Sequence, residues 1–459
     1  MPAFVLMFAA ISTTTRAQPP LQIYLPVMGM AARQSLFAVQ SDPGFLSRPE
    51  IRARAADLGA RWVRLDGFIW HEVQTQRGGP YNWQALRRVD DALASARDLG
   101  MTPVGIIRGA PEWAAVVPSN CAAIRDEYLG EFAAFLEALA WRYRGQVDHW
   151  EIGNEPDVDP GLVPSDSPYG CMGDVHDLYY GGERYGRMLQ VATPALHRGN
   201  PEARIIFGGL LLSESDTSDA SMGNPERFFE GALRAGGGAY FDILAYHTYP
   251  SYSGQPLLDH DIAVPGPWQH LGGWTVGKVN FLSEVMSRYG VRKPLWLNET
   301  SLICSSNSLY CATPDAAFFE AQAHHLVRTF ARAAAADVSQ VTWYTLEGPG
   351  WRWSSLLDGR QQPRPAYVAF RNMARMVEPF SEVRRVEYGV GVEAYRFVQG
   401  SKVVDVLWSQ GGERRVVRVP FIRAIGARRL DGSSIAGQIV DTSIQWQVDF
   451  APILIERRP

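Results

Sequence analysis

Short apolar runs rich in β-branched and aromatic residues recur along the first three quarters of the chain, and a longer amphipathic stretch separates each run from the next. Runs of this length, bounded by turn residues, are typical of buried strands. We predict eight strands, at residues 35–40, 61–67, 102–109, 147–155, 203–209, 241–249, 294–300 and 341–347.

The stretches between these strands carry apolar residues at helical spacing, and several end in glycine, a common helix terminator. The clearest predicted helices cover residues 48–59, 82–100, 128–145 and 316–336. Strands that alternate with helices indicate βα units around a parallel sheet. Eight units in about three hundred residues favour the α/β class and a closed (β/α)8 TIM barrel at residues 35–375. An open doubly wound sheet is the alternative, but no G-x-G-x-x-G fingerprint follows the first strand.

The pattern changes after residue 375, where apolar and polar residues alternate between glycine-containing turns. The segment 376–459 contains no convincing helix, and this alternation is typical of half-buried antiparallel strands. We therefore predict a C-terminal antiparallel β-sandwich domain. It either braces the barrel or binds a ligand of its own, and bracing is favoured because no row of aromatic residues marks a binding face. Residues 18–34 are a linker or a strand added to this domain.

The N-terminal residues combine an apolar run at 3–11 with polar residues that lead to Ala17. The run is too short to span a bilayer, and the pattern predicts a secretory signal peptide at 1–17. The positive residues that usually begin such a peptide are missing, so a wrongly assigned start codon is the alternative. No later run predicts a membrane span, and we expect a secreted or extracytoplasmic protein.

Four cysteines agree with export. Cys304 and Cys311 are close enough in sequence to close a short loop, and Cys121 would then pair with Cys171. Four cysteines allow three pairings, and free buried thiols are the alternative. Metal binding is disfavoured because no C-x-x-C or histidine-rich spacing accompanies them.

Composition narrows the class of partner. The 459 residues carry a net charge of −4 and contain no basic stripe or tail, so nucleic acid is not an expected partner. Fourteen tryptophans and eighteen tyrosines either fill a large core or line a sugar-binding cleft. The sequence does not indicate an oligomeric state.

Polar side chains gather where the predicted strands end, and at this edge barrel enzymes carry their chemistry. Strand four ends in Asn154-Glu155 and strand seven in Asn298-Glu299. These strands face each other across the barrel mouth, so the two glutamates can act on one glycosidic bond. One carboxylic acid protonates the leaving oxygen, and the other carboxylate attacks the anomeric carbon or activates water. A gap of about 5 Å implies retention of configuration, and a gap of about 6.5–9.5 Å implies inversion.

The segments WEIGNEPD (150–157) and PLWLNET (294–300) resemble those of clan A of the glycoside hydrolases, the retaining (β/α)8 enzymes. The resemblance extends over roughly residues 35–375. It implies that Glu155 is the acid/base and Glu299 the nucleophile. The segment 354–370 also resembles the post-barrel segment of family 39, whereas Gly153 within EIGNE is closer to families 51, 79 and 44.

The same resemblance implies roles for further residues. Arg64 matches the arginine that keeps the nucleophile ionised, and Asn154 matches the residue that bonds the sugar 2-hydroxyl. Tyr249 or His247 matches the strand-six group near the nucleophile. Trp343 matches a tryptophan that forms the floor of the sugar site. Among the tryptophans of the predicted loops, Trp113 and Trp351 lie closest to a strand end and are candidates for sugar subsites.

Other polar residues near strand ends have ordinary explanations. Glu151 lies inside its strand, where a structural ion pair is favoured over chemistry. Asp66 either binds sugar or caps a turn, and Glu112 and Glu347 either touch substrate or are solvated. His324 and His325 lie on a predicted helix, so a core or surface role is favoured over metal binding.

We therefore predict a retaining glycoside hydrolase that acts on a poly- or oligosaccharide, with carbohydrate as its partner. It should need no metal or organic cofactor, because two carboxylates suffice. One alternative is a non-catalytic carbohydrate-binding protein on a barrel scaffold. Another is a transglycosylase, which would use the same residues.

Overall fold

The computed structural model describes residues 35–165, 170–213, 223–264, 266–304 and 311–459. The predicted signal peptide at 1–17 and the segment 18–34 lie outside these residues. Among the described residues, none of the helices is long and apolar enough to cross a membrane.

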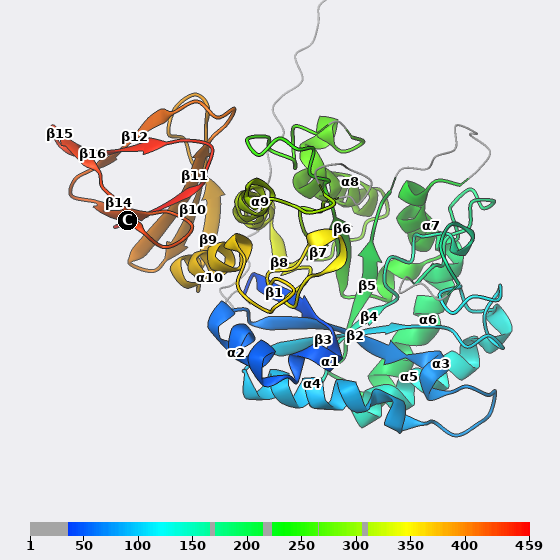
Figure 1. Cartoon of the computed structure of the whole chain (residues 1–459). Coiled ribbons are helices and arrows are strands. Elements are labelled where there is room, and N and C mark those ends of the chain that lie inside the picture. The colour runs from blue at the N-terminus through cyan, green and yellow to red at the C-terminus, as the bar shows by residue number, and fades with distance from the viewer. Residues whose placement is uncertain (1–34, 166–169, 214–222, 265, 305–310) are drawn as a thin grey trace, which may run out of the picture. The chain divides into compact units, whose positions relative to one another are not determined.

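Eight parallel strands follow one another around a closed barrel in chain order, and the last pairs with the first (Figure 1). The predicted α/β class and TIM barrel are confirmed. The strands are β1 (Phe37–Ser41), β2 (Trp62–Ile69), β3 (Thr102–Arg108), β4 (His149–Ile152), β5 (Arg204–Leu210), β6 (Ile243–Thr248), β7 (Leu295–Thr300) and β8 (Val338–Trp343).

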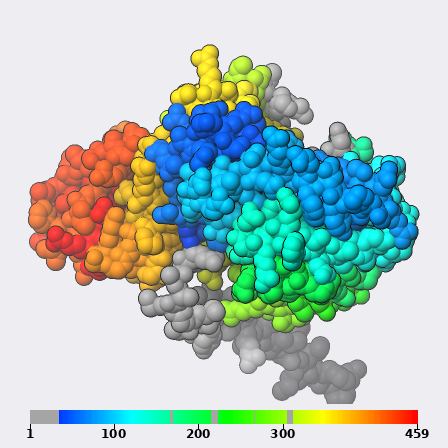
Figure 2. All heavy atoms as spheres, turned by 90° about the horizontal axis from the view of Figure 1, so that it is seen from below, coloured from blue at the N-terminus to red at the C-terminus, as the bar shows by residue number. Residues whose placement is uncertain are grey.

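Helices follow the strands and cover the outside of the barrel (Figure 1). In the view of Figure 2, the blue and cyan atoms of the first βα units form most of one face. The α-helices are α1 (Pro43–Leu46), α2 (Pro49–Leu58), α3 (Trp70–Val73), α4 (Arg87–Asp98), α5 (Leu129–Arg142), α6 (Gly182–Gly199), α7 (Phe228–Arg234), α8 (Gly273–Arg288), α9 (Ala316–Ala335) and α10 (Pro365–Val377). Short 3-10 turns are η1 (Trp83–Leu86), η2 (Asp126–Tyr128), η3 (Pro160–Leu162), η4 (Pro225–Arg227), η5 (Gly237–Ala239), η6 (Gln269–Leu271) and η7 (Trp351–Trp353).

Local sequence signals explain where these helices begin and end. Helix α2 starts with Pro49, whose missing N–H is not needed in the first turn, and it stops at Gly59, which has a φ of 87°. Helix α9 is capped by Asp315, whose carboxylate accepts a hydrogen bond of 3.1 Å from the backbone N–H of Phe318.

The interior of the barrel is filled at the end where the strands begin. Trp62 and Trp296 meet edge to face with ring centres 5.3 Å apart, and His149 stacks on Trp296. Small and branched side chains complete this buried cluster: Ala38, Val104, Ile206, Ile243 and Ala245. Because these side chains fill the barrel at the amino ends of the strands, we expect a site at the carboxyl ends.

The C-terminal region forms two antiparallel sheets with a separate core, as predicted. One sheet has the order β14-β13-β17-β11-β10-β9 and the other β12-β16-β15. Its strands are β9 (Glu382–Arg385), β10 (Val392–Gln399), β11 (Lys402–Ser409), β12 (Arg415–Pro420), β13 (Ala424–Arg428), β14 (Ser434–Ile435), β15 (Gln438–Val440), β16 (Ser443–Val448) and β17 (Ile453–Arg457).

Two disulfide bonds join the predicted cysteine pairs. Cys121 of the β3–α5 connection is bonded to Cys171 of the β4–α6 connection, and Cys304 is bonded to Cys311 in the β7–α9 connection. Both bonds therefore lie in loops that follow the carboxyl ends of barrel strands.

Candidate active site

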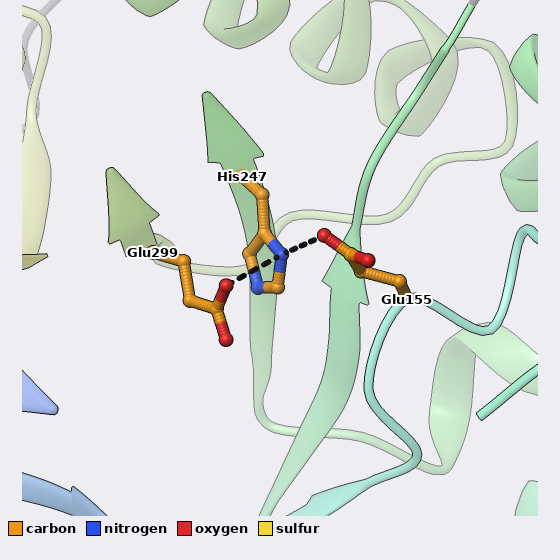
Figure 3. Close-up of side chains that lie close together, drawn as sticks. All are labelled: Glu155, His247 and Glu299. Carbon is orange, nitrogen blue, oxygen red and sulfur yellow. Dashed lines mark hydrogen bonds and ion pairs between the residues drawn. The ribbon is translucent and has the colours of Figure 1, made fainter. Parts of the chain in front are cut away.

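Glu155 and Glu299 meet at the mouth of the barrel (Figure 3). Each is only 4% exposed. One carboxylate oxygen of each glutamate and a ring nitrogen of His247 all lie within 4.8 Å of one another. The predicted pair thus faces a common space, although the two residues are far apart in the chain.

The backbone at the end of β4 explains how Glu155 reaches this position. The strand ends at Ile152, earlier than predicted, because Gly153 turns the chain with a φ of 80°. Glu155 itself has a φ of 52°, a left-handed conformation that is uncommon outside glycine. Strained backbone of this kind is frequent in functional sites. Glu299, in contrast, lies within the regular strand β7.

Both carboxylate oxygens of Glu299 accept hydrogen bonds, one from buried Arg64 and one from half-buried Tyr249. The guanidinium of Arg64 donates to one oxygen and the hydroxyl of Tyr249 donates to the other. Burial raises the pKa of Glu299, while Arg64 and Tyr249 oppose this rise. The two donors therefore favour an ionised carboxylate at this position.

Arg64 organises the floor of the site. It donates to both oxygens of Glu151, at 2.7 and 2.8 Å, and to the side-chain oxygen of Asn154 at 2.7 Å. It also donates to Gln40. Glu151 is thus the structural ion pair that its place within the strand predicted. The same guanidinium orients Asn154, so one buried cation fixes several polar groups.

The environment of Glu155 differs from that of Glu299. Burial raises the pKa of Glu155 well above its ordinary value, and the nearby charges of Glu299 and Asp157 raise it further. Its contact with a side chain is to Nδ1 of His247, at 2.8 Å. Two neighbouring carboxyls held in different surroundings can serve as an acid and as a nucleophile.

His247 stands between the two glutamates (Figure 3). Its Nδ1 is 2.8 Å from Glu155 and 3.5 Å from Glu299. Burial lowers the pKa of His247 well below its ordinary value, and Arg64 and Lys278 lower it further. The ring is therefore neutral near pH 7, and its single proton can be shared with Glu155.

Gly209 of β5 makes room for this ring. A Cβ at that position would lie 2.0 Å from Nε2 of His247 and 2.6 Å from the side-chain oxygen of Asn298. Any side chain there would displace the imidazole, because such a separation is far below van der Waals contact.

A cavity of about 390 Å³ opens over the two carboxylates. Its aromatic wall contains Tyr344 and the half-exposed Trp351, and Tyr249 contacts both rings edge-on, at 5.9 and 5.6 Å. Asp66 also lines the cavity and is bonded to Arg108 at 2.7 Å. The remaining lining residues are Gln40, Asn154, Leu211, Leu212, Ser213, Ser251, Pro267, Trp268, Trp274, Lys278, Ile303 and Arg352.

Four predicted binding residues lie outside this lining. Arg64 and His247 still contact the two glutamates, whereas Trp343 and Trp113 pack elsewhere. Trp343 is fully buried, and its indole N–H donates to the carbonyl of Ser354 at 2.9 Å. It points toward His325 of α9, so the next residue, Tyr344, faces the cavity instead. In this structure Trp343 therefore cannot form the floor of a sugar site.

Trp113 also packs away from the cavity. The centre of its ring lies 5.4 Å from that of Trp70 and 5.6 Å from that of Tyr128, and both contacts are edge-on. Of the two tryptophans predicted to lie closest to a strand end, Trp351 is the one that reaches the cavity.

The other polar candidates are explained by local contacts. Glu347 is buried and accepts hydrogen bonds from Ser41 and from the backbone of Asp42. Glu112 is exposed. His325 packs on Trp343 and His324 on Phe450.

Sequence reasoning missed Lys278 of α8, which lines the cavity and is fully buried. A lysine on a largely apolar helix usually extends its ammonium to solvent. One signal could have drawn attention to it, because the chain contains only three lysines.

Glu155, His247 and Glu299 are close enough together to hold a metal ion. However, both oxygens of Glu299 already accept from Arg64 and Tyr249. An ion would have to displace these donors and would face the positive charge of the guanidinium. The site therefore suits proton transfer and nucleophilic attack better than metal coordination.

No protein-family model and no curated protein sequence matches the chain. Solved structures do. A family 39 glycoside hydrolase from Bacteroides cellulosilyticus WH2 superposes with a TM-score of 0.66 and 17% identity, covering 92% of this chain and 81% of that one. A family 30 endoxylanase from Clostridium papyrosolvens C71 gives 0.60 and 11%, covering 93% and 98% of the two chains.

An α-L-arabinofuranosidase from Thermotoga maritima is also similar, with a TM-score of 0.55 and 13% identity over 93% of this chain and 97% of that one. At these identities the likeness concerns the fold. The predicted resemblance to the clan A glycoside hydrolases is confirmed at that level, and the chain has the fold of these enzymes.

Proposed function

We propose that this protein is a retaining glycoside hydrolase, with Glu155 as the acid/base and Glu299 as the nucleophile. The observation that carries the proposal is the separation of the two carboxylates. One oxygen of Glu155 lies within 4.8 Å of one oxygen of Glu299. This distance is nearer to the separation of about 5–5.5 Å between the carboxyl groups of retaining enzymes than to the separation of about 6.5–9.5 Å in inverting enzymes.

In the first step, Glu299 attacks the anomeric carbon and forms a glycosyl ester. Protonated Glu155 gives its proton to the glycosidic oxygen, so the leaving group departs as an alcohol. Arg64 and Tyr249 keep Glu299 ionised until it reacts. The amide of Asn154, oriented by Arg64, can donate to the sugar 2-hydroxyl.

In the second step, water hydrolyses the ester and Glu155 acts as base. Esterification removes the negative charge of Glu299, one of the charges that raise the pKa of Glu155. The pKa of Glu155 therefore falls when a base is needed. One residue can thus serve both steps.

The proposed substrate is a poly- or oligosaccharide. The cavity offers flat aromatic surface at Trp351 and Tyr344 beside the carboxylates, and such rings pack against the apolar faces of sugars. The similar structures are described as xylanases, a glucosidase and arabinofuranosidases. We propose a substrate of these classes.

We also propose that the protein is exported. The Cys121–Cys171 and Cys304–Cys311 disulfides are of the kind that persists in oxidising compartments. Export agrees with a polymeric substrate, which would be met outside the cell.

The test is a screen of aryl xylosides, arabinofuranosides, glucosides and glucuronides, repeated with Glu155→Ala and added azide. Azide should restore turnover of the variant and yield a glycosyl azide with the configuration of the substrate. Product analysis with acceptor sugars separates hydrolysis from transglycosylation. Binding of oligosaccharides without turnover of any substrate would instead indicate a carbohydrate-binding protein.

A further inference from the structure

Lys278 is a buried cation beside the candidate acid/base that the mechanism above does not use. It extends from α8 into the barrel mouth and is fully buried. Its ammonium donates to the carbonyl of Leu211 at 2.6 Å and to the carbonyl of His247 at 2.7 Å. The ring centres of Trp268 and Trp274 lie 5.5 and 5.2 Å from it. Burying an ammonium is costly unless it is held in this way.

Asp157 is the corresponding buried anion. It follows Glu155 by two residues and is also fully buried. Its two oxygens accept hydrogen bonds from the backbone N–H groups of Leu211 and Leu212, at 2.9 and 2.6 Å. Leu212 has a left-handed backbone with a φ of 50°, so this pair of bonds stabilises a strained turn that lines the cavity.

Asp157 and Lys278 therefore both hydrogen-bond to the backbone of the segment Leu211–Leu212. The backbone N–H of Leu211 donates a hydrogen bond to Asp157, and the carbonyl of Leu211 accepts one from the ammonium of Lys278. The segment lies where β5 ends, next to the acid/base, because the backbone N–H of Glu155 donates to the carbonyl of Gly209 at 3.1 Å. A change in either charge would act both on this wall and on Glu155.

We propose that Lys278 and Asp157 are positioning residues of opposite charge that act on Glu155 from two sides. Their effect on catalysis rests on the proposed glycoside hydrolase function. Lys278 favours the ionised form of the acid/base, and Asp157 favours the protonated form. Together they hold the wall at Leu211–Leu212.

Other charged groups also lie near Glu155 and change its pKa, in addition to Lys278 and Asp157. Glu299 repels a charge on Glu155, and Arg64 attracts it. Neutral His247 is hydrogen-bonded to it. Burial, in turn, lowers the pKa of Lys278 to about 7, and the negative charges of Asp157 and Glu155 oppose that fall. Burial raises the pKa of Asp157 to about 6.

The first experiment observes Lys278 directly in the folded enzyme. Selective ¹³C labelling of lysine gives three side-chain signals, because the chain has three lysines. The signals are assigned by elimination with Lys293→Met and Lys402→Met, at positions outside the site. Lys278 should titrate near pH 7, well below the ordinary lysine pKa of about 10.4.

Neutralising a partner should then move that signal. Asp157→Asn removes a negative charge near Lys278 and should therefore lower the pKa of the lysine further. Glu155→Gln replaces a carboxyl that is largely protonated near pH 7, so it should lower that pKa by less. If the Lys278 signal titrates near pH 10 instead, or if neither variant moves it, the proposal is overturned. This readout does not depend on enzyme activity.

The second experiment follows catalysis, through the alkaline limb of kcat/KM, which reports the acid/base in the free enzyme. Lys278→Met removes a positive charge, so the pKa of Glu155 rises and the limb should move up by roughly one pH unit. Asp157→Asn removes a negative charge, so the limb should move down. Lys293→Met should leave it in place.

Opposite shifts support the proposal, since a purely structural role would lower kcat without opposite movements of the limb. Unmoved limbs, or limbs that move the same way, overturn it. If either Lys278→Met or Asp157→Asn does not fold, the other variant and the lysine titration still test the proposal. Absence of turnover by the parent enzyme on all glycosides would count against the proposed function, and the lysine titration would then test the charge coupling alone.

Discussion

Two buried arginines, Arg332 of α9 and Arg64 of β2, each stand among carboxylates, yet the surrounding acids differ in behaviour. Arg332 donates two hydrogen bonds to Glu393, two to Asp259 and one to Asp261, at 2.7–3.1 Å. Burial alone would raise the pKa of these acids. Arg332 outweighs it for Asp259 and Glu393, whose pKa values are lowered, but not for Asp261.

At the barrel mouth, the guanidinium of Arg64 is shared between Glu151 and Glu299. In the described part of the chain, no arginine hydrogen-bonds to Glu155, which contacts neutral His247 instead. The pKa of Glu155 is therefore raised by burial and by its acidic neighbours.

In both clusters a buried arginine lies among carboxyl groups. The carboxylates that receive hydrogen bonds from Arg332 take a structural role, whereas Glu155, which receives none from a guanidinium of the described residues, has a raised pKa and can act as an acid. The Arg332 cluster joins the β6–α8 connection to β10 of the C-terminal domain. It is a contact that supports the predicted bracing role of that domain. The Arg64 cluster leaves one carboxyl without an arginine, and this carboxyl is the proposed acid.

The largest effect is expected from removing the charge of the proposed nucleophile. Glu299→Gln should lower kcat roughly 10⁴-fold or more, because a neutral amide cannot form the glycosyl ester. Steady-state kinetics with an aryl glycoside measure this loss, and circular dichroism checks the fold. Activity equal to that of the parent enzyme would show that another group does the chemistry.

Substitution of Arg332 should lower the stability of the protein rather than its catalytic rate. Arg332→Met leaves buried carboxylates without their partner and should cost about 3–5 kcal/mol in the free energy of unfolding. Denaturant unfolding near pH 7 measures this cost, and kcat of the folded enzyme should change little. A loss of kcat at unchanged stability would contradict the comparison.

The pH dependence of that cost has a defined sign. In the fold the pKa of Asp259 and Glu393 is lowered, so their stabilisation is complete above the ordinary carboxyl pKa of about 4. It is lost as pH falls further. The difference between the parent enzyme and Arg332→Met should therefore narrow in acid.

Glu155→Gln should show the opposite behaviour. The pKa of Glu155 is higher in the folded protein than in the unfolded chain. The free energy of unfolding therefore falls as pH rises above the ordinary glutamate pKa of about 4.3. The neutral variant should be more stable at neutral pH, by about 0.5–2 kcal/mol. Thermal unfolding should show this gain at pH 7 and little difference near pH 4. Equal unfolding midpoints of the variant and the parent protein at both pH values would contradict the raised pKa of Glu155.

The smallest effect concerns the cavity wall, which separates binding from chemistry. Trp351 is 44% exposed, lines the cavity and touches Tyr249. Trp351→Ala should raise KM roughly tenfold, a loss of about 1.4 kcal/mol, with a smaller change in kcat. Trp141→Ala, an exposed tryptophan on α5, is the control and should leave KM unchanged. A loss confined to kcat would place Trp351 in the catalytic machinery instead.

Much of the fold could be predicted because barrel strands are buried on both sides and are separated by helices of clear periodicity. The positions of Glu155 and Glu299 followed from that topology, since the carboxyl ends of parallel strands meet at one mouth. The cysteine pairing also followed, as the shortest loop that could close.

Orientation at the ends of elements could not be predicted. Whether Trp343 or Tyr344 faces the cavity depends on a shift of one residue, and successive side chains of a strand point to opposite sides. Lys278 was missed for a related reason. Its helix reaches the site only through the path of the long β6–α8 connection, which no local pattern specifies.

The glycine at position 209 carries a wider consequence. Its only contribution is empty space, since a methyl group there would collide with the imidazole of His247. A search profile assembled from reactive groups alone would omit this position. Mutational surveys of the barrel should find it among the least tolerant sites, although it has no functional group to lose.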